Sequence, residues 1–287
     1  MNILLNINNF SESFAYDVLS EILDPRMKVL IIPFSYHEDW ITCEADFDAH
    51  YRKGCEEYED IAKEFMNYGI ARRNIQVLHY YKDSPRKCKN KIYHADVLFL
   101  TGGYPDKFLY RIDQKHIRKA IQKFRGVIMG TSAGAMIQFD RYHVTPEEEG
   151  QDYEYHEGLG LISGFDIEVH YEDSFEHLSS LIMDLKFHGI PIFALPNWGG
   201  MIVDGEDMML LGDAFEIGVE DIDELQQTLD EIIEEAEYTE EAEYTDEENF
   251  DSEEARYAED DAYGDEEDFD SEEAGDAEEA ENFGEEF

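Results

Sequence analysis

Basic residues are scarce in this sequence. Among its 287 residues, 22 are Lys or Arg and 70 are Asp or Glu, which gives a formal net charge of −48. A protein that binds nucleic acid needs a basic surface to displace counterions from phosphates, and an anionic membrane repels a surface of its own sign. We therefore expect neither a nucleic-acid partner nor a membrane partner.

Long apolar runs and paired cysteines are also missing. The sequence has no run of about 18 apolar residues, the minimum for a membrane-spanning helix. Residues 1–5 lack the basic positions that begin a secretory signal, so we expect them to form a buried strand. The cysteines Cys43, Cys55 and Cys88 have no CxxC spacing, which favours neither a disulfide framework nor a zinc site. We expect a cytoplasmic protein with no metal and no other cofactor.

The negative charge is concentrated near the C-terminus. Residues 221–287 contain 33 acidic residues and one basic residue, Arg256, so they carry −32 and leave −16 for residues 1–220. Short acidic repeats recur there, and such units cannot bury an apolar face. We expect one folded domain over 1–220 and a mostly disordered acidic tail over 221–287, with one helix over 222–233 before order is lost.

Apolar strands and helical patterns alternate through the rest of the chain. Continuous apolar runs, typical of strands in a parallel sheet covered on both faces, occupy 29–32, 75–78, 97–100 and 127–129. Helical spacing is found over 11–23, 45–68, 115–124 and 174–186. Later, shorter strands are expected over 165–169, 190–195 and, as a hairpin, 201–211. The order predicts a doubly wound α/β domain with three layers, α/β/α.

The turn after the strand 127–129 carries the strongest chemical signal. Residues 130–134 read Gly-Thr-Ser-Ala-Gly and fit the pattern G-x-S-x-G between a strand and a helix. Such a turn holds a serine in a strained conformation at the carboxyl edge of the sheet, where its hydroxyl is exposed. The alternative is a plain tight turn with a capping serine. The preceding strand and the small residues that follow favour Ser132 as a nucleophile.

A second glycine turn supports this interpretation. Gly102 and Gly103 follow the strand 97–100, and loops at the carboxyl ends of neighbouring parallel strands meet at one crevice. The backbone N–H of Gly103 can then join that of Ala133 in an oxyanion hole. An ordinary turn, with glycine for a positive φ angle, is the alternative.

These residues resemble a known family. The segment 130–135, the preceding Thr101-Gly102-Gly103 and the later Leu195-Pro196 are similar to motifs of the peptidase E and cyanophycinase family, the S51 serine peptidases. The resemblance covers about residues 27–212. It implies a glutamine amidotransferase-like fold, with serine in place of the amidotransferase cysteine, and cleavage of small peptides after aspartate.

A serine nucleophile needs a base, and histidine is the usual one. His170 is the best candidate, because it ends the expected strand 165–169 and its distance from Ser132 along the chain matches the position of the family's base. His143 and His156 are the alternatives.

The third member of the triad departs from the family pattern. The acid expected after Leu195-Pro196 is replaced by Asn197, which can orient an imidazole but cannot stabilise its positive charge as a carboxylate does. A second assignment places the acid about fifteen residues after the serine, where Glu147 begins a run of three glutamates. Either an acid comes from there or the triad is incomplete.

Three functions remain open from the sequence. The first is a serine peptidase that resembles peptidase E and hydrolyses aspartyl or related small peptides through an acyl-enzyme. The second, favoured by Asn197, is a catalytically weak relative that binds a small molecule or a protein. An α/β-hydrolase esterase is the third, but that fold needs a histidine late in the chain, and none follows His188.

The acidic tail also suggests a partner. Residues 72–125 contain 14 basic and four acidic residues. Because the two segments have opposite charge, we expect the tail to contact the segment 72–125 or a basic partner protein.

Overall fold

The computed structural model describes residues 1–146 and 153–236. Within the chain, Met1–Glu234 form one compact unit, so the folded part extends beyond residue 220, where the sequence suggested a boundary. The expected disorder and repeats of 237–287 lie outside the described residues, as does Glu147. No helix among the described residues has the length and apolar character needed to cross a membrane.

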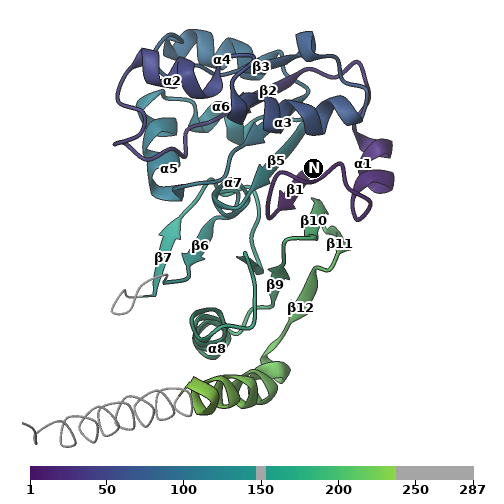
Figure 1. Cartoon of the computed structure of the whole chain (residues 1–287), viewed down its shortest axis with the longest axis vertical. Coiled ribbons are helices and arrows are strands. Elements are labelled where there is room, and N and C mark those ends of the chain that lie inside the picture. Colours follow the sequence, from purple (N-terminus) through teal and green to yellow (C-terminus); the bar gives the residue numbers. More distant parts are fainter. Residues whose placement is uncertain (147–152, 237–287) are drawn as a thin grey trace, which may run out of the picture. The chain divides into compact units, whose positions relative to one another are not determined.

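A seven-stranded, mostly parallel sheet forms the centre of the unit (Figure 1). Five parallel strands lie in the spatial order β1 (Asn2–Leu5), β5 (Val127–Thr131), β4 (Val97–Leu100), β2 (Val29–Ile32) and β3 (Ile75–Val77). The hairpin β10 (Gly199–Asp204) and β11 (Asp207–Gly212) continues the sheet antiparallel to β1. The predicted parallel sheet, the buried N-terminal strand and the late hairpin are therefore confirmed.

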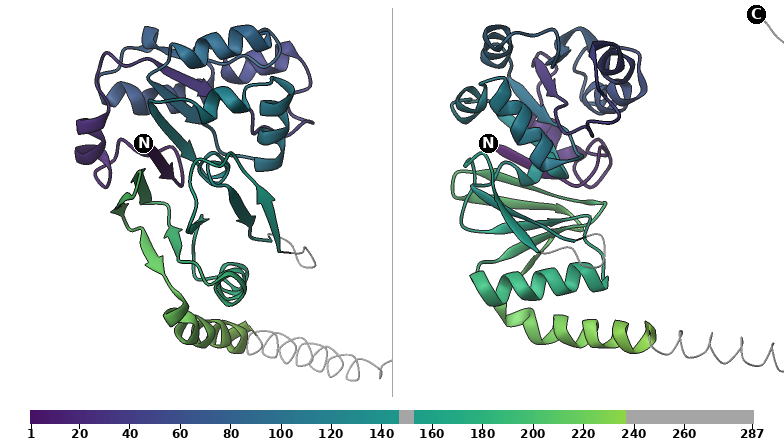
Figure 2. Two further views of the ribbon diagram at one scale, coloured as in Figure 1. Left: turned by 180° about the vertical axis from the view of Figure 1, so that it is seen from behind. Right: turned by 90° about the vertical axis from the view of Figure 1, so that its left-hand side faces the viewer.

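Helices cover both faces of this sheet (Figure 2). Successive side chains of a strand point to opposite faces, so Leu98 and Leu100 enter one apolar cluster while Val97 and Phe99 enter another. The first cluster is covered by α4 (Pro85–Tyr93), α5 (Pro105–Gln114) and α6 (Arg118–Gln122). The second is covered by α1 (Tyr16–Ile22) and α3 (Glu56–Asn67). The three-layer α/β/α architecture is confirmed.

One predicted helix is divided in the structure. The pattern over 45–68 suggested a single long helix, but the chain forms α2 (Glu44–Tyr51) and α3. Gly54, between them, has φ 94°, a conformation that glycine adopts readily and that a helix does not contain. The 3₁₀ helix η1 (Arg72–Asn74) then leads into β3.

The strands after residue 140 form two smaller sheets. β6 (Arg141–Val144) pairs with β7 (Glu154–Glu157), while β8 (Asp166–Val169), β9 (Ile192–Leu195) and β12 (Phe215–Ile217) form a three-stranded sheet. Next to it, α8 (Phe175–His188) begins after Ser174. The Ser174 side chain accepts a hydrogen bond from the His177 backbone N–H, as predicted for an N-cap. After the 3₁₀ helix η2 (Val219–Asp221), residues 222–236 are helical, and their leucines pack with those of α8.

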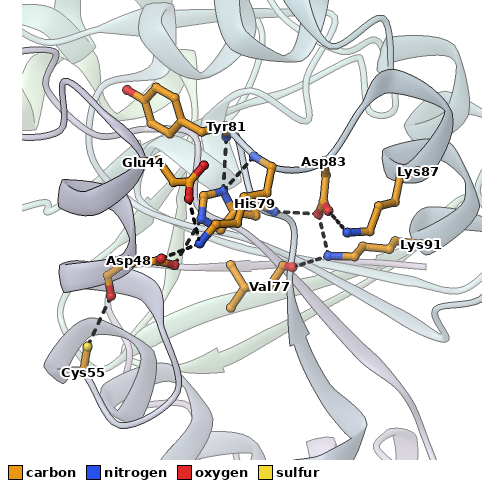
Figure 3. Close-up of polar contacts among 10 residues, drawn as sticks. Glu44, Asp48, Cys55, Val77, His79, Tyr81, Asp83, Lys87 and Lys91 are labelled. Carbon is orange, nitrogen blue, oxygen red and sulfur yellow. Dashed lines mark hydrogen bonds and ion pairs between the residues drawn. The ribbon is translucent and has the colours of Figure 1, made fainter.

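Carboxylates pair with several lysines of segment 72–125. Asp83, which is almost fully buried, contacts Lys87 Nζ at 2.6 Å and Lys91 Nζ at 2.5 Å (Figure 3). On α2, Asp48 pairs with Lys82 and lies 3.2 Å from His79 Nε2. These lysines therefore serve local contacts. The expected contact between this segment and the acidic tail stays a prediction, since residues 237–287 are not described.

Candidate active site

Ser132 occupies the corner between β5 and the short helix α7 (Ala133–Met136). Its φ angle is 48° and its ψ angle −119°, a conformation that costs energy for any residue other than glycine. The flanking glycines make the corner possible, because a Cβ on Gly130 would lie 2.0 Å from the Gly134 carbonyl oxygen, and one on Gly134 2.1 Å from that of Leu100. The sequence thus folds here into the strained turn that G-x-S-x-G predicts.

The structure brings His170 to this serine. His170 Nε2 lies 2.9 Å from Ser132 Oγ, within hydrogen-bond distance. His170 follows β8 directly and has φ 58°, so both residues of the pair have the positive φ that is rare outside glycine. The imidazole can therefore accept the hydroxyl proton from a position fixed by the backbone.

The two alternative histidines lie elsewhere. His143 is buried, and its ring nitrogens contact Asp166 Oδ2 at 2.8 Å and Glu168 Oε2 at 2.5 Å. His156, on β7, lies beside the Tyr142 ring, with 5.6 Å between the ring centroids and 33° between the ring planes. Neither of them contacts Ser132 among the described interactions.

Asn197 reaches His170 only indirectly. Its side-chain Oδ1 accepts a hydrogen bond of 2.9 Å from Asn6 Nδ2. Asn6 Oδ1 in turn accepts a hydrogen bond of 2.8 Å from the backbone N–H of His170. No hydrogen bond joins the Asn197 carboxamide to the His170 ring, both residues being described. Glu147, the other candidate for the third position, is outside the described residues. The structure therefore gives Asn197 a role in supporting the backbone of His170.

Asn6 is a residue next to the site that the sequence analysis missed. It is 1% exposed and follows β1, so one buried carboxamide connects the first strand, the histidine and the loop before β10. The signal was present: a single asparagine ends an apolar strand that reaches the same sheet edge as Ser132. The asparagine could be assigned to this edge only once the order of the strands in the sheet was known, and the periodicity of the sequence does not give that order.

Replacing Asn6 with alanine is expected to slow catalysis about 10- to 100-fold, because the positive-φ backbone of His170 loses its acceptor and the imidazole is less well positioned. The effect should appear in kcat with little change in KM. Asn6→Asp keeps an acceptor for the His170 N–H and should recover part of the rate. Steady-state kinetics of the two variants check this, and equal losses in both would contradict the positioning role.

Two backbone N–H groups are available next to Ser132. Gly103 has φ 129°, and a Cβ there would lie 2.6 Å from the Ser35 carbonyl oxygen, so this backbone path requires glycine. Within the described part of the chain, neither the Gly103 N–H nor the Ala133 N–H donates a hydrogen bond. Such N–H groups are suited to an oxyanion that forms as the serine attacks a carbonyl. They are the two groups expected from the sequence.

Two cavities meet at the serine and histidine. The larger one, of about 770 Å³, extends toward β8 and α8, and the smaller one, of about 350 Å³, extends toward the end of β1 and α3. Gly103, Ser132 and His170 line both cavities. A substrate that lies across Ser132 can therefore place one part in each cavity.

A buried charge network forms one wall of the larger cavity. Burial by itself would lower the pKa of His143, but the charges of Asp166 and Glu168 and their hydrogen bonds outweigh it and hold that pKa well above its usual range. Burial would raise the pKa of Glu168, yet the charge and hydrogen bonds of His143 and those of His177 lower it to about 2. The network thus contains an imidazolium and a carboxylate that stabilise each other.

The same network contains the one metal-type cluster found among the described residues. Ligand atoms of His143, Asp166 and Asp184 lie within 4.8 Å of one another. However, both nitrogens of the His143 ring lie within hydrogen-bond distance of carboxylates, so in this arrangement each ring nitrogen already has a partner. We therefore describe these residues as a charge network.

The chain is similar to known proteins in sequence and in fold. The profile of Peptidase family S51 matches residues 48–211. A crystal structure of a putative peptidase E protein from Listeria monocytogenes EGD-e is 17% identical and superposes with a TM-score of 0.51, covering 73% of this chain and 96% of that one. A peptidase from an acI-B1 Actinobacterium is 15% identical, with a TM-score of 0.52 and coverage of 76% and 93%. A search of curated proteins finds no match.

Proposed function

Because the chain belongs to peptidase family S51, we propose that it is a serine peptidase in which Ser132 is the nucleophile and His170 the general base. The observation that carries this proposal is the distance of 2.9 Å between Ser132 Oγ and His170 Nε2, at a strained strand-to-helix corner. The available N–H groups of Gly103 and Ala133 support it further.

The proposed reaction has two steps. Ser132 Oγ attacks the carbonyl carbon of the scissile peptide bond while its proton passes to His170 Nε2, and the N–H groups of Gly103 and Ala133 hold the oxyanion. His170 then gives the proton to the leaving amine, the carbon–nitrogen bond breaks, and an acyl-enzyme remains. A water molecule, deprotonated by His170, attacks the ester carbon, which releases the acid product and returns the proton to Ser132.

Small peptides are the proposed substrates. The family resemblance implies aspartyl peptides, so these are the first class to compare. The two cavities support the size of this class, because together they accommodate a few residues on each side of the serine.

Labelling with a fluorophosphonate probe tests the proposal. The probe is expected to modify intact protein stoichiometrically, and mass spectrometry of the digested product should locate it on Ser132. Denatured protein is the control, because a serine without its base is a weak nucleophile. Failure of the folded protein to react would support the alternative of an amidotransferase-like binding protein without hydrolase activity.

A further inference from the structure

The charge around Ser132 points to a substrate of a particular sign. The larger cavity is lined by the carboxylates of Glu168, Glu172 and Glu176, and the smaller cavity by those of Glu57 and Asp60. No Lys or Arg is among the described residues that line either cavity.

The histidines of the larger cavity do not reverse this sign. His143 is bonded to Asp166 and Glu168, as described above. His177 Nδ1 lies 2.7 Å from Glu168 Oε1, and its pKa is raised because the hydrogen bond and charge of Glu168, together with the charges of Glu172 and Glu176, outweigh the effect of burial. Each of these two rings thus already has a carboxylate partner before a substrate enters.

Two carboxylates remain for a ligand in this cavity. Glu172 lies just before α8 and Glu176 lies in its first turn. Both are exposed, and neither forms an ion pair with a described residue. In the smaller cavity, Asp60 accepts a hydrogen bond from Asn8 at 3.0 Å, and Glu57 pairs with His50. The free negative charge is therefore greatest in the larger cavity.

Several lysines of the domain pair with carboxylates that line neither cavity. Lys107, two positions after the lining residue Pro105, lies 3.0 Å from Glu38 Oε2. The lysines of Figure 3 contact Asp48 and Asp83, which line neither cavity beside Ser132. A substrate carboxylate would thus meet no Lys or Arg among the described residues that line the two cavities, and it would face like charge.

We propose that this site selects peptides with Lys or Arg next to the scissile bond, with the cationic side chain in the larger cavity near Glu172 and Glu176. Opposite charges at such a site favour the cationic substrate, and like charges disfavour an aspartyl one. The selection rests on the proposed function, because it describes the substrate class of the same serine. It departs from the aspartate preference that the family resemblance implies.

Peptidyl diphenyl phosphonates that differ only in the residue next to phosphorus test the proposal on the full chain. Ser132 Oγ bonds to phosphorus as a phenolate leaves, so the rate reports binding and attack without turnover. The lysine probe is expected to react at least about 10-fold faster than the aspartate probe, with the norleucine probe between them. High salt should reduce the ratio, because both glutamates are exposed.

The double variant E172Q/E176Q identifies the groups responsible. We expect it to lower the lysine-to-aspartate ratio several-fold, chiefly because the lysine probe reacts more slowly, and the norleucine probe measured alongside reports any general loss of reactivity. Glu206→Gln is the control. It removes one negative charge on the exposed turn between β10 and β11, outside both cavities, and should leave the lysine-to-aspartate ratio unchanged.

The outcomes separate the two proposals. If a small fluorophosphonate labels Ser132 but the phosphonates react equally, or the aspartate probe reacts fastest, the charge selection is wrong and the peptidase proposal stands. An unchanged ratio in E172Q/E176Q would likewise overturn the assignment to these glutamates. If the fluorophosphonate does not label Ser132, the proposed function fails, and the selection fails with it.

Discussion

Replacing Ser132 with alanine is expected to lower kcat/KM for peptide hydrolysis by about 10⁴-fold or more, since loss of a serine nucleophile removes the covalent route altogether. The residual rate would come from the oxyanion N–H groups and from binding. Progress curves at high enzyme concentration, with a peptide substrate that carries the side chain preferred in the probe series, measure the change.

The fold should tolerate this replacement. The Ser132 side chain is half-buried and its hydroxyl bonds to His170 alone among the described contacts, so the thermal unfolding midpoint is expected to change little. Ser163→Ala, at an exposed serine before β8, is the matched control and should retain full activity. Hydrolysis at the wild-type rate in Ser132→Ala would show that the activity belongs to another site.

The largest expected loss of stability comes from the buried charge network. Glu168→Gln removes a carboxylate that is 2% exposed and leaves the His143 imidazolium with Asp166 as its carboxylate partner. Breaking one side of a buried ion pair typically costs about 3–5 kcal/mol of the free energy of unfolding. Urea denaturation measures this loss. Glu216→Gln, an exposed glutamate on β12, is the control and should change the free energy little.

The pH dependence of stability gives a second measure of the same network. Glu168 has a lowered pKa in the folded state, so its contribution is present above its usual value of 4.5 and is lost as the pH falls toward about 2. His143 has a raised pKa, so its contribution is complete below 6.5 and is lost as the pH rises through the folded-state pKa. The contribution of this pair to the free energy of unfolding should therefore be greatest between pH 4.5 and pH 6.5.

Glu168→Gln should remove the Glu168 contribution on the acid side and reduce the loss on the alkaline side, where Asp166 alone still favours the imidazolium. Unfolding free energies over a pH series check both arms. Parallel curves for the wild type and the variant would contradict the charge coupling of His143 and Glu168.

Local patterns in the sequence predicted the parts of the site that depend on neighbours in the chain. Small residues around Ser132 indicated a sharp corner, and the structure shows backbone against backbone at Gly130 and Gly134. The apolar run 97–100 followed by Gly102-Gly103 predicted a strand whose loop reaches the same edge, and β4 does pair with β5. These features are short-range, so spacing and residue size are sufficient to find them.

Features that depend on partners distant in the sequence were not predicted. Asn6 acts through residues 164 and 191 positions away, and His143 is neutralised by carboxylates 23 and 25 positions away. Periodicity does not report such contacts, so His143 remained a possible base until the fold showed its partners. The division of the helix 45–68 at Gly54 depends on a single left-handed residue, which amphipathic spacing does not detect.

The central position of the first strand has a consequence for biosynthesis. β1 pairs with β5 on one side and with β10 on the other, and the residue after it holds both the histidine backbone and Asn197. The ribosome makes β1 first and β10 close to the end of the compact unit. The contacts of β1 and of Asn6 are therefore complete only after β10 has left the ribosome.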